Sequence, residues 1–437
     1  MSKKPIKASP TKEFFIDMLT RDIRLDRAII DLVDNCIDGA KNLKPSEDYE
    51  GLNVIVDFSE KEFSIKDNCG GFSLEVAQEY AFRFGRPKGA EFVKHSIGRF
   101  GVGMKRSLLK MGRKFSVESK HKDDHFLVEV DVLEWLKEPE NWNFDYLEKE
   151  DIPANKRNLN GEDGTVIFVK DLYDNIIDDF KDTEFQNKLR REISMALSYS
   201  LLKKIDIRLN DSIVKRIDIG LLESEELKPV FIKKDFDNVS VRIYAGVGEY
   251  YPQRAGWYIF CNDRLVLEAD KSYTTGWKEN KDDEGNIIKY HNDYAMFRGA
   301  IFFDSPNSSL LPMTTTKTGI DSNHSVFKAT RPFILQALKQ VISFLKKVED
   351  KEEGEAIINN SSRIDITEVR KNEKKYTETF KHPTTNKQLK ANKNVGIQYS
   401  KDRLLVEKVK NYLGVSANWE VGSKTFDYFV EMNKEEL

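Results

Sequence analysis

Asp31 and Asn35 are polar residues whose spacing could support phosphoryl chemistry. They lie four residues apart in the segment DLVDNCIDGA, which spans residues 31–40, so on a helix they would share one face, a turn apart. An Asn side-chain oxygen can ligate Mg²⁺ beside phosphates, and a carboxylate one turn earlier can hold and polarise an attacking water. The alternative is that both residues mark the hydrated side of an amphipathic helix.

Asp67 begins a second pattern, the sequence DNCGGF over residues 67–72. The carboxylate ends a strand-like run, and the paired glycines Gly70 and Gly71 follow it. Such an Asp could accept a hydrogen bond from an exocyclic amine, while the glycines would let a flat base approach the backbone. An ordinary Asp/Asn/Gly turn accounts for the same residues equally well.

A third pattern is glycine-rich and leads directly into a helix-like run. Residues 97–107 read IGRFGVGMKRS, and free backbone N–H groups at a helix start can cradle phosphate. The cations of residues 83–88, RFGRPK, could close over a nucleotide. A glycine loop alone is weak evidence, and Gly164-Thr165, which opens a later strand, is by itself only a strand start.

Alternating helix-like and strand-like segments must position these patterns. Apolar periodicity predicts a helix over residues 22–42, a hairpin over 53–58 and 62–65, and helices over 72–84 and 104–111. Strands are expected at 114–119, 125–132 and 165–169, with a polar surface insertion over 137–164. These elements predict an N-terminal domain over residues 1–175.

The rest of the chain predicts a second α+β domain over residues 176–349. A helix is expected at 184–202, strands at 205–209, 239–245, 256–260 and 300–303, and a closing helix at 331–347. Residues 350–396 are dominated by Lys, Glu, Asn and Thr, which predicts a charged linker. Two amphipathic helices, 402–412 and 420–432, form a small docking unit over residues 397–437, because two short helices bury little alone.

Composition excludes several functional classes. The 437 residues carry a formal net charge of −3, which gives no overall attraction to nucleic acid or to an anionic membrane. The three cysteines, Cys36, Cys69 and Cys261, indicate no disulfide framework, and no apolar run approaches the ~20 residues needed to cross a bilayer. We therefore expect a soluble cytoplasmic protein. His121 and His125 could share a helix face, but without further ligands a zinc site there is not expected.

Taken in order, the four patterns resemble the GHKL ATPase superfamily of gyrase B, heat-shock chaperones, histidine kinases and MutL. The resemblance covers residues 10–175 and is nearest to MORC-like and MutL-like ATPases, and it implies a Bergerat-type α/β sandwich that binds ATP and Mg²⁺ between helix and lid. By this resemblance Asp31 is the catalytic acid, Asn35 the metal ligand and Asp67 the adenine acceptor. The implied nucleotide-binding residues are Asn35, Asp38, Asp67, Gly71, Lys88, Gly98, Phe100, Gly101, Val102, Gly103, Met104, Lys105 and Thr165.

Two positions depart from the family pattern. The general-base position usually holds Glu, and Asp31 retracts the carboxylate by one methylene, roughly 1.5 Å. Since a misplacement of about 1 Å can cost ~10²-fold in rate, hydrolysis is expected to be slow. Cys69 occupies a position that usually holds Gly, and Gly70 could take over its backbone role.

The second domain resembles a transducer. Residues 313–319, MTTTKTG, resemble the gyrase loop whose lysine reaches the γ-phosphate, which makes Lys317 a second catalytic candidate; the alternative is an exposed loop lysine. Residues 256–266 resemble the transducer strand pair of MutL and MORC proteins. The segment from Pro10 to Leu19 could cross to a partner protomer as a strap or pack on its own domain.

The resemblance implies an ATPase that dimerises through its N-terminal domains when ATP binds. By analogy it would act with DNA or with a partner protein recruited by the C-terminal helices, for example in defence. The alternatives are a chaperone-like ATPase acting on client proteins, or a nucleotide-binding module with little turnover.

Overall fold

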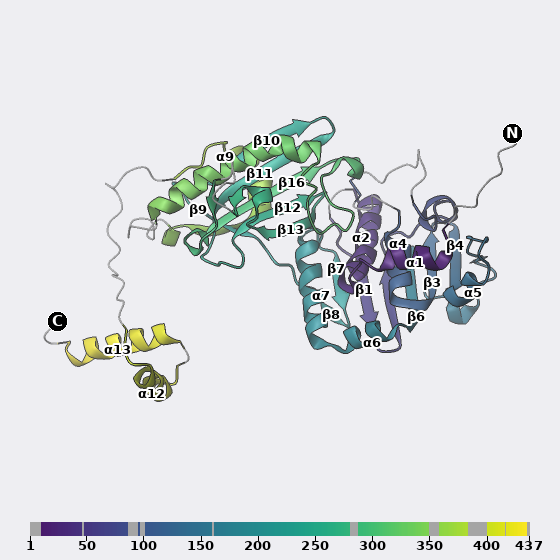
Figure 1. The fold of residues 1–437 in the computed structure, drawn as a ribbon, viewed down its shortest axis with the longest axis horizontal. Helices are drawn as coiled ribbons and strands as arrows, with labels where there is room; N and C mark the ends of the chain where they lie inside the picture. The colour runs from purple at the N-terminus through teal and green to yellow at the C-terminus, as the bar shows by residue number, and fades with distance from the viewer. Residues whose placement is uncertain are drawn as a thin grey trace, which may run out of the picture. The chain divides into compact units, whose positions relative to one another are not determined.

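The computed structural model describes residues 10–45, 48–85, 95–96, 101–159, 161–279, 287–348, 358–382, 400–415 and 417–434. The chain divides into two compact units, residues 1–387 and 388–437. In its described residues the larger unit contains an eight-stranded and a five-stranded sheet, each with its own helices (Figure 1), and two small two-stranded sheets.

The first sheet has eight strands in the order β5-β4-β3-β6-β2-β1-β7-β8. All neighbouring pairs are antiparallel except β1 and β7, which are parallel. Burial alternates along β1 and β2, as expected for a sheet with one covered face. The strands are β1 (Asn53–Phe58), β2 (Glu62–Asp67), β3 (Gly112–His121), β4 (Asp124–Asp131), β5 (Tyr146–Glu148), β6 (Gly164–Leu172), β7 (Asp206–Leu209) and β8 (Ser212–Ile213).

The helices of this domain share one hydrophobic core with the sheet. Residues of α2, α4, α6 and α7 pack with the inward-facing residues of the strands, which makes a two-layer α/β sandwich (Figure 1). The helical elements are α1 (Lys12–Thr20), α2 (Leu25–Leu43), α3 (Leu74–Val76), the π-helical turn η1 (Ala77–Ala81), α4 (Gly103–Met111), α5 (Val132–Leu136), the 3₁₀ turn η2 (Ala154–Lys156), α6 (Asp174–Lys181), α7 (Thr183–Ala196) and α8 (Ser198–Leu202).

The predicted end of the first domain at residue 175 is wrong. The chain crosses over through α6, α7 and α8 and returns as β7, which extends the first sheet beside β1. Ile207 and Leu209 of β7 lie in the core of the first domain. The sequence predicted residues 205–209 as a strand of the second domain. Its parallel partner β1 lies about 150 residues earlier, and no local pattern indicates a pairing at that distance.

Two local predictions also need correction. The predicted helix over residues 72–84 is short and irregular, consisting of α3 and the π-turn η1. His121 and His125 do not share a helix face, because they flank the β3–β4 hairpin.

The second sheet has five strands in the order β10-β11-β16-β12-β13. Helix α9 contacts β10, β11 and β16, and aromatic residues of the opposite face form a separate core with residues of α7, α8 and α11. The elements are β9 (Gly220–Glu223), β10 (Val230–Phe236), β11 (Val239–Val247), β12 (Gly256–Cys261), β13 (Arg264–Asp270), η3 (Tyr273–Thr275), β14 (Trp277–Lys278), β15 (Ile288–Lys289), η4 (Asn292–Tyr294), β16 (Phe297–Asp304), η5 (Ser308–Leu310), α9 (Ser325–Val348), β17 (Ser362–Asp365), α11 (Ile366–Lys371) and η6 (Glu373–Lys375).

The charged linker predicted over residues 350–396 is wrong for residues 358–382. Strand β17 pairs antiparallel with β9, and Ile366, Val369 and Tyr376 are buried in the core of the second domain. These few apolar residues lie among charged ones, so the composition of the segment concealed its packing.

The smaller unit contains α12 (Arg403–Leu413) and α13 (Asn418–Met432), close to the two predicted helices. Asp402 caps the start of α12 and Gly414, with a φ of 65°, ends it. In the described part of the chain no helix is long and apolar enough to cross a membrane.

Candidate functional site

Helix α2 carries its polar residues on the face opposite its core contacts. Ile29, Val33 and Ile37 are fully buried against the sheet. The opposite face carries acidic and amide side chains at i, i+3, i+4 and i+7, the spacing of one helical face. These residues are Asp31, Asp34, Asn35 and Asp38.

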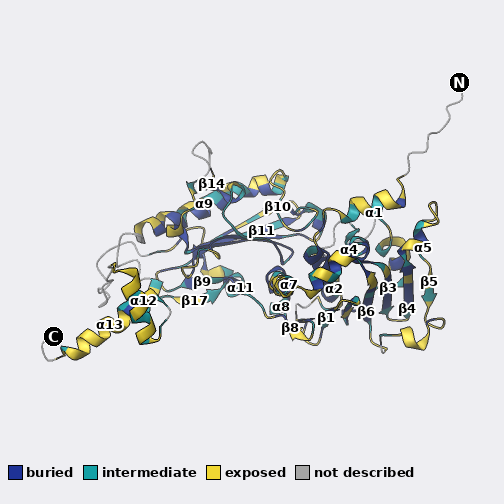
Figure 2. Cartoon of the chain, turned by 60° about the horizontal axis from the view of Figure 1, so that its bottom comes forward, coloured by how far each residue is buried: buried dark blue, intermediate teal, exposed yellow. Residues whose placement is uncertain are grey.

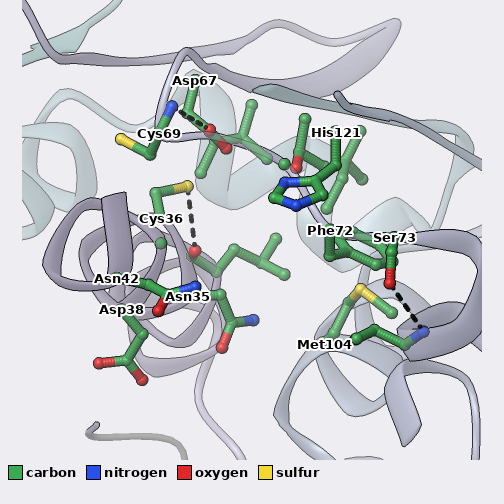
Figure 3. A pocket seen from close by; sticks show the side chains of 17 residues that line it. Asn35, Cys36, Asp38, Asn42, Asp67, Cys69, Phe72, Ser73, Met104 and His121 are labelled. Carbon is green, nitrogen blue, oxygen red and sulfur yellow. Dashed lines mark hydrogen bonds between the residues drawn. The ribbon is translucent and has the colours of Figure 1, made fainter. Parts of the chain in front are cut away.

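A cavity of about 300 Å³ lies between this face of α2 and the ends of β2, β3 and β6. Asn35 and Asp67 both line it, and Figure 3 shows them on different walls of the same space. The sequence-predicted residues Asp38, Gly71, Met104 and Thr165 line the same cavity. The helix pattern and the strand-end pattern are therefore brought together in one pocket.

Asp67 is a buried carboxylate on the wall of this cavity, with only 5% of its surface exposed. It accepts a hydrogen bond of 2.8 Å from the backbone N–H of Cys69. Burial raises the pKa of Asp67 to about 6, although backbone N–H groups of Cys69 and Thr165 oppose the shift. Such a group can accept a hydrogen bond from a ligand amine where little water competes.

Two glycines allow the backbone to close tightly around Asp67. Gly71 has a φ of 57°, and a Cβ there would lie 2.1 Å from the carbonyl oxygen of Lys120. A Cβ at Gly164 would lie 2.1 Å from the carbonyl oxygen of Asp67. Gly71 and Gly164 are therefore required by the packing of β2, β3 and β6 at the cavity wall.

Sequence reasoning missed several residues of this wall. His121 ends β3 and lines the cavity, where its Nδ1 lies 2.7 Å from the carbonyl oxygen of Gly70. Phe72 and Cys36 line it as well (Figure 3). Alternation along residues 112–121 could have placed His121 on a strand, but no local signal indicated that this strand ends at the cavity.

A second cavity, of about 540 Å³, adjoins the first and shares Asn35, Phe72 and Met104 with it. It lies at the start of α4, where Gly101, Val102 and Gly103 line it. Its charged lining residues are Asp31, Lys105, Arg106 and Lys317. Three basic side chains against one carboxylate, together with a helix N-terminus, favour an anion as ligand of this cavity.

Lys105 is almost completely buried, and its Nζ donates to the carbonyl oxygens of Ala81, at 2.7 Å, and of Gly101. Its hydrogen-bond acceptors are neutral carbonyls, and burial lowers the pKa of Lys105 to about 7. A phosphate in the adjoining space would favour the charged form of this lysine.

Buried ion pairs connect α2 to α4 and to the second domain. Arg106 donates to Oδ2 of Asp31 at 2.5 Å, and Nζ of Lys317 lies 3.1 Å from Oδ1 of the same carboxylate. The same Nζ lies 2.9 Å from Oδ2 of Asp34, while Nε of Arg264 donates to Oδ1 of Asp34 at 2.9 Å. Both oxygens of each carboxylate are thus paired with a cation.

Neighbouring charges keep the members of this buried cluster ionised. Burial disfavours the charged Lys317, but the carboxylates of Asp34 and Asp31 outweigh it and hold its pKa above the ordinary value. Burial likewise disfavours the charged Asp34, but Arg264 and Lys317 outweigh it and hold its pKa below the ordinary value. Removal of any member takes one of its partners from a buried charge.

Lys317 occupies the tip of a tight loop. Met313 and Ile320 form a β-bridge, and Lys317 has a φ of 54°. The loop carries this lysine from the second domain into the cavity of the first, so it is not an exposed loop lysine. Lys88, Gly98 and Phe100 were also predicted for the site, but they lie outside the described residues.

The N-terminal segment has features of both predicted arrangements, packing on its own domain and contact with a partner protomer. Phe15 packs its ring edge-to-face on Phe84 and Trp142 of its own domain. Phe14 and Met18, in contrast, are 61% and 53% exposed. One face of α1 is therefore packed on its own domain, and another is free to contact a partner.

Comparison with known families identifies the first domain. Residues 23–165 match the family model described as histidine kinase-, DNA gyrase B-, and HSP90-like ATPase. No curated protein shows significant sequence similarity to the chain. The matched residues contain α2, Asp67, the start of α4 and Thr165, all of which line the two cavities. Residues 23–165 of the chain therefore match a GHKL-type ATPase domain.

Proposed function

We propose that the chain is a conformational switch that binds ATP with Mg²⁺ and hydrolyses it slowly. The observation that carries this proposal is the pair of adjoining cavities, with a buried carboxylate at one end and three cations at the other. A nucleotide has the matching distribution, with an amine-bearing base at one end and phosphates at the other. The match of residues 23–165 to an ATPase family model supports the same assignment.

At the base end, Asp67 would accept the exocyclic amine of adenine. Thr165 would support the hydrogen-bond network, since its backbone pairs with Asp67 in the sheet. The flat walls made by Gly71 and Phe72 fit an aromatic ring. At the other end, the N–H groups of residues 101–105 and the ammonium of Lys105 would bind the phosphates.

Asn35 would hold the magnesium ion. It lies where the two cavities meet and is the exposed residue among its neighbours on α2. Among the described residues no cluster of three His, Cys, Asp or Glu could hold a metal ion. A single side-chain oxygen can suffice for Mg²⁺, which commonly takes one or two protein oxygens and completes its shell with phosphates and water. When bound, this ion would neutralise phosphate charge.

Lys317 would act as the sensor of the γ-phosphate. In the structure its ammonium pairs with Asp31 and Asp34, so Oδ1 of Asp31 is engaged by a cation. A γ-phosphate in the second cavity would attract the Lys317 ammonium and release that oxygen. Phosphate binding would then both free the general base and move the loop of the second domain.

A nucleotide-binding module with little turnover is the second candidate. Two features of Asp31 favour it: the side chain is one methylene shorter than the usual Glu, and Arg106 occupies its other oxygen. Slow hydrolysis would suit a switch that has to stay in its ATP-bound state for a long time and does not need rapid ATP turnover.

The switch would work as a clamp in which ATP joins two N-terminal domains. The exposed Phe14 and Met18 on α1 support this arrangement, because closure onto a partner protomer would bury them. The second domain would be a transducer of the MORC-like or MutL-like kind, with Lys317 as the residue that senses the γ-phosphate. Such a clamp would act with DNA or a partner protein, for instance in a defence system.

Phosphate release by the wild type and by Asp31→Asn tests the hydrolytic switch. We expect both proteins to bind ATP and only the wild type to release phosphate above background. Equal release would favour the module without turnover. DNA binding measured with and without ATP across a salt series tests the DNA-linked clamp, since an ATP-dependent gain is expected.

A further inference from the structure

Two residues of the first domain, His95 and Ser96, are bonded directly to the second domain. The backbone N–H of His95 donates to the carbonyl oxygen of Pro306 at 3.2 Å. The side-chain amide of Asn262 donates to the carbonyl oxygen of Ser96 at 3.1 Å. Only four residues separate Ser96 from residues 101–105, which would bind the phosphates. The second domain therefore holds the chain just before the groups proposed to bind phosphate.

Asn262 is placed for this contact by the turn between β12 and β13. Asn262 and Asp263 have φ values of 48° and 67°, the left-handed conformation that a two-residue hairpin turn favours and that Asn adopts more readily than most residues. The amide is also fixed within its own domain, because Nδ2 donates to the carbonyl oxygen of Ser305 at 3.0 Å and Oδ1 accepts from the N–H of Ser305 at 2.9 Å. The two N–H bonds of the amide are thus divided between the two domains.

Lys41, in the last turn of α2, completes the contact from the side of the first domain. Its ammonium donates to the carbonyl oxygen of His95 at 3.0 Å and to that of Asn262 at 3.2 Å. It also lies 3.6 Å from Oδ1 of Asp38, which lines the first cavity. Lys41, His95, Ser96 and Asn262 together form a tether that joins α2, the chain before residues 101–105 and the second domain.

The centre of the tether is enclosed, and one of its residues has an uncommon backbone conformation. Asn262 and Ser96 are 3% and 4% exposed, and Figure 2 shows burial of this degree, in dark blue, along the strands of the two large sheets. Loss of the Asn262 donor would leave a buried carbonyl oxygen without a partner. His95 has a φ of 60°, a conformation that persists in a residue with a side chain where its surroundings impose it. The tether therefore fixes the backbone at residues 95–96.

This tether is distinct from the contact that Lys317 makes with α2. Lys317 pairs with the carboxylates of Asp31 and Asp34, so a phosphate could compete for its charge. Asn262 is neutral and bonds to a backbone carbonyl oxygen, so a phosphate does not compete with it in this way. The second domain thus reaches the nucleotide site by two routes, and each can be altered without removing the other.

We propose that Asn262 and Lys41 are positioning residues through which the second domain sets the affinity for the phosphates of ATP. This inference rests on the proposed function, which assigns the phosphates to residues 101–105. Because only four residues intervene, the position of Ser96 limits how the chain enters that segment. A chain already held there has less freedom to lose when phosphates bind. Since coupling is reciprocal, phosphate binding would in turn favour the tethered arrangement of the second domain.

Binding of ATP and of adenosine to the full-length protein, both with Mg²⁺, tests this inference. Asn262→Asp keeps the acceptor for the N–H of Ser305 and suits the turn, but it places an oxygen where the donor to Ser96 was. We expect ATP to bind about tenfold more weakly, because one buried hydrogen bond is lost. Adenosine should bind within twofold of the wild-type affinity, because Asp67 and the base end of the site do not depend on the tether.

Lys41→Met removes the tether from its other side, and we expect the same pattern of weaker ATP binding with little change for adenosine. Asn307→Asp is the matched control. Asn307 lies in the same loop as Ser305, and its Oδ1 accepts from the N–H of Ser309 at 3.0 Å, a bond that Asp retains. This control should bind both ligands as the wild type does.

The ratio of the two affinities separates positioning from a purely structural role. An equal loss for ATP and adenosine would show general damage to the domain, and unchanged ATP affinity in both variants would show that the tether does not act on the phosphates; either result overturns the inference. In both cases a wild type that binds ATP leaves the proposed function standing. A wild type that binds no ATP would remove the proposed function and this inference with it.

Discussion

The ammonium nitrogen of Lys317 lies 2.9 Å from a carboxylate oxygen of Asp34, although 283 positions separate the two residues along the chain. This contact joins a loop of the second domain to the helix that carries Asp31 and Asn35. The same nitrogen lies 3.1 Å from Asp31. Lys317 of the second domain is therefore held by two carboxylates of α2.

Replacement of Lys317 should affect both stability and turnover. Lys317→Met leaves Asp34 with Arg264 alone and Asp31 with Arg106 alone, so we expect a loss on the order of 1.5–3 kcal/mol in the free energy of unfolding. Urea denaturation measures it, and phosphate release should fall at least tenfold. Lys271→Met is the control, since Lys271 donates to the carbonyls of Pro252 and Ala255 and not to α2. Equal stability of the two variants would contradict the buried cluster.

Asn35 should govern the magnesium dependence of ATP binding. Asn35→Ala removes the side-chain oxygen at the junction of the two cavities, so we expect weaker binding of ATP in the presence of Mg²⁺ and little change in its absence. Asn42→Ala is a matched control, because Asn42 lies on the same helix and lines the first cavity. Isothermal titration with and without Mg²⁺ measures both. An unchanged affinity of Asn35→Ala for Mg-ATP would refute the ligand assignment.

Asp67→Asn should stabilise the free protein while weakening ATP binding. The folded-state pKa is raised to about 6, so at pH 8 the folded state holds an unfavourable buried charge. Removing it should add about 1–3 kcal/mol to the free energy of unfolding at pH 8. The gain should shrink as the pH falls through 6, because the wild-type carboxyl then becomes protonated.

Thermal denaturation between pH 5 and pH 8 checks this prediction. Asp57→Asn on the neighbouring strand is the control; its pKa is also raised by burial, but the group is less enclosed, so its effect should be smaller. In the wild type, ATP binding should weaken below pH 6, since protonation removes the charged acceptor. A stability gain that grows toward acid pH would contradict the assignment.

ATP binding at pH 8 should take up a proton at Lys105. Burial lowers its pKa to about 7, so at pH 8 the free protein holds the neutral amine, and a bound phosphate would restore the charge. Titration calorimetry in buffers of different ionisation enthalpy should show an uptake approaching one proton per nucleotide. Lys105→Met should lose this uptake and bind more weakly. An uptake that persists in the variant would assign the proton to another group.

Local patterns were sufficient to predict α2, the β1–β2 hairpin and the residues on them. The i, i+4 spacing of Asp31 and Asn35 predicted a shared face, and the structure places both beside the cavities. Asp34 was not singled out, because nothing nearby in sequence indicates that its partners, Arg264 and Lys317, come from the second domain. Long-range pairs of this kind have no local signal.

The predicted domain boundary at residue 175 was wrong for a related reason. Strand β7 looks like any other short strand, and only its parallel pairing with β1 reveals its domain. Ile366, Val369 and Tyr376 were similarly hidden in a charged segment, since their burial depends on the complementary surface of β9 and the second sheet. The resemblance to a family helped only over the region where motifs occur.

The β12–β13 turn contacts α2 at two places. Arg264 reaches Asp34, and the carbonyl of Asn262 accepts from Lys41 at 3.2 Å. These positions on α2 are two turns apart, roughly 10 Å along its axis. Neither contact involves Lys317, so the turn would stay attached to α2 if that lysine moved to a γ-phosphate. The second domain would then keep its hold on the helix while its loop changed position.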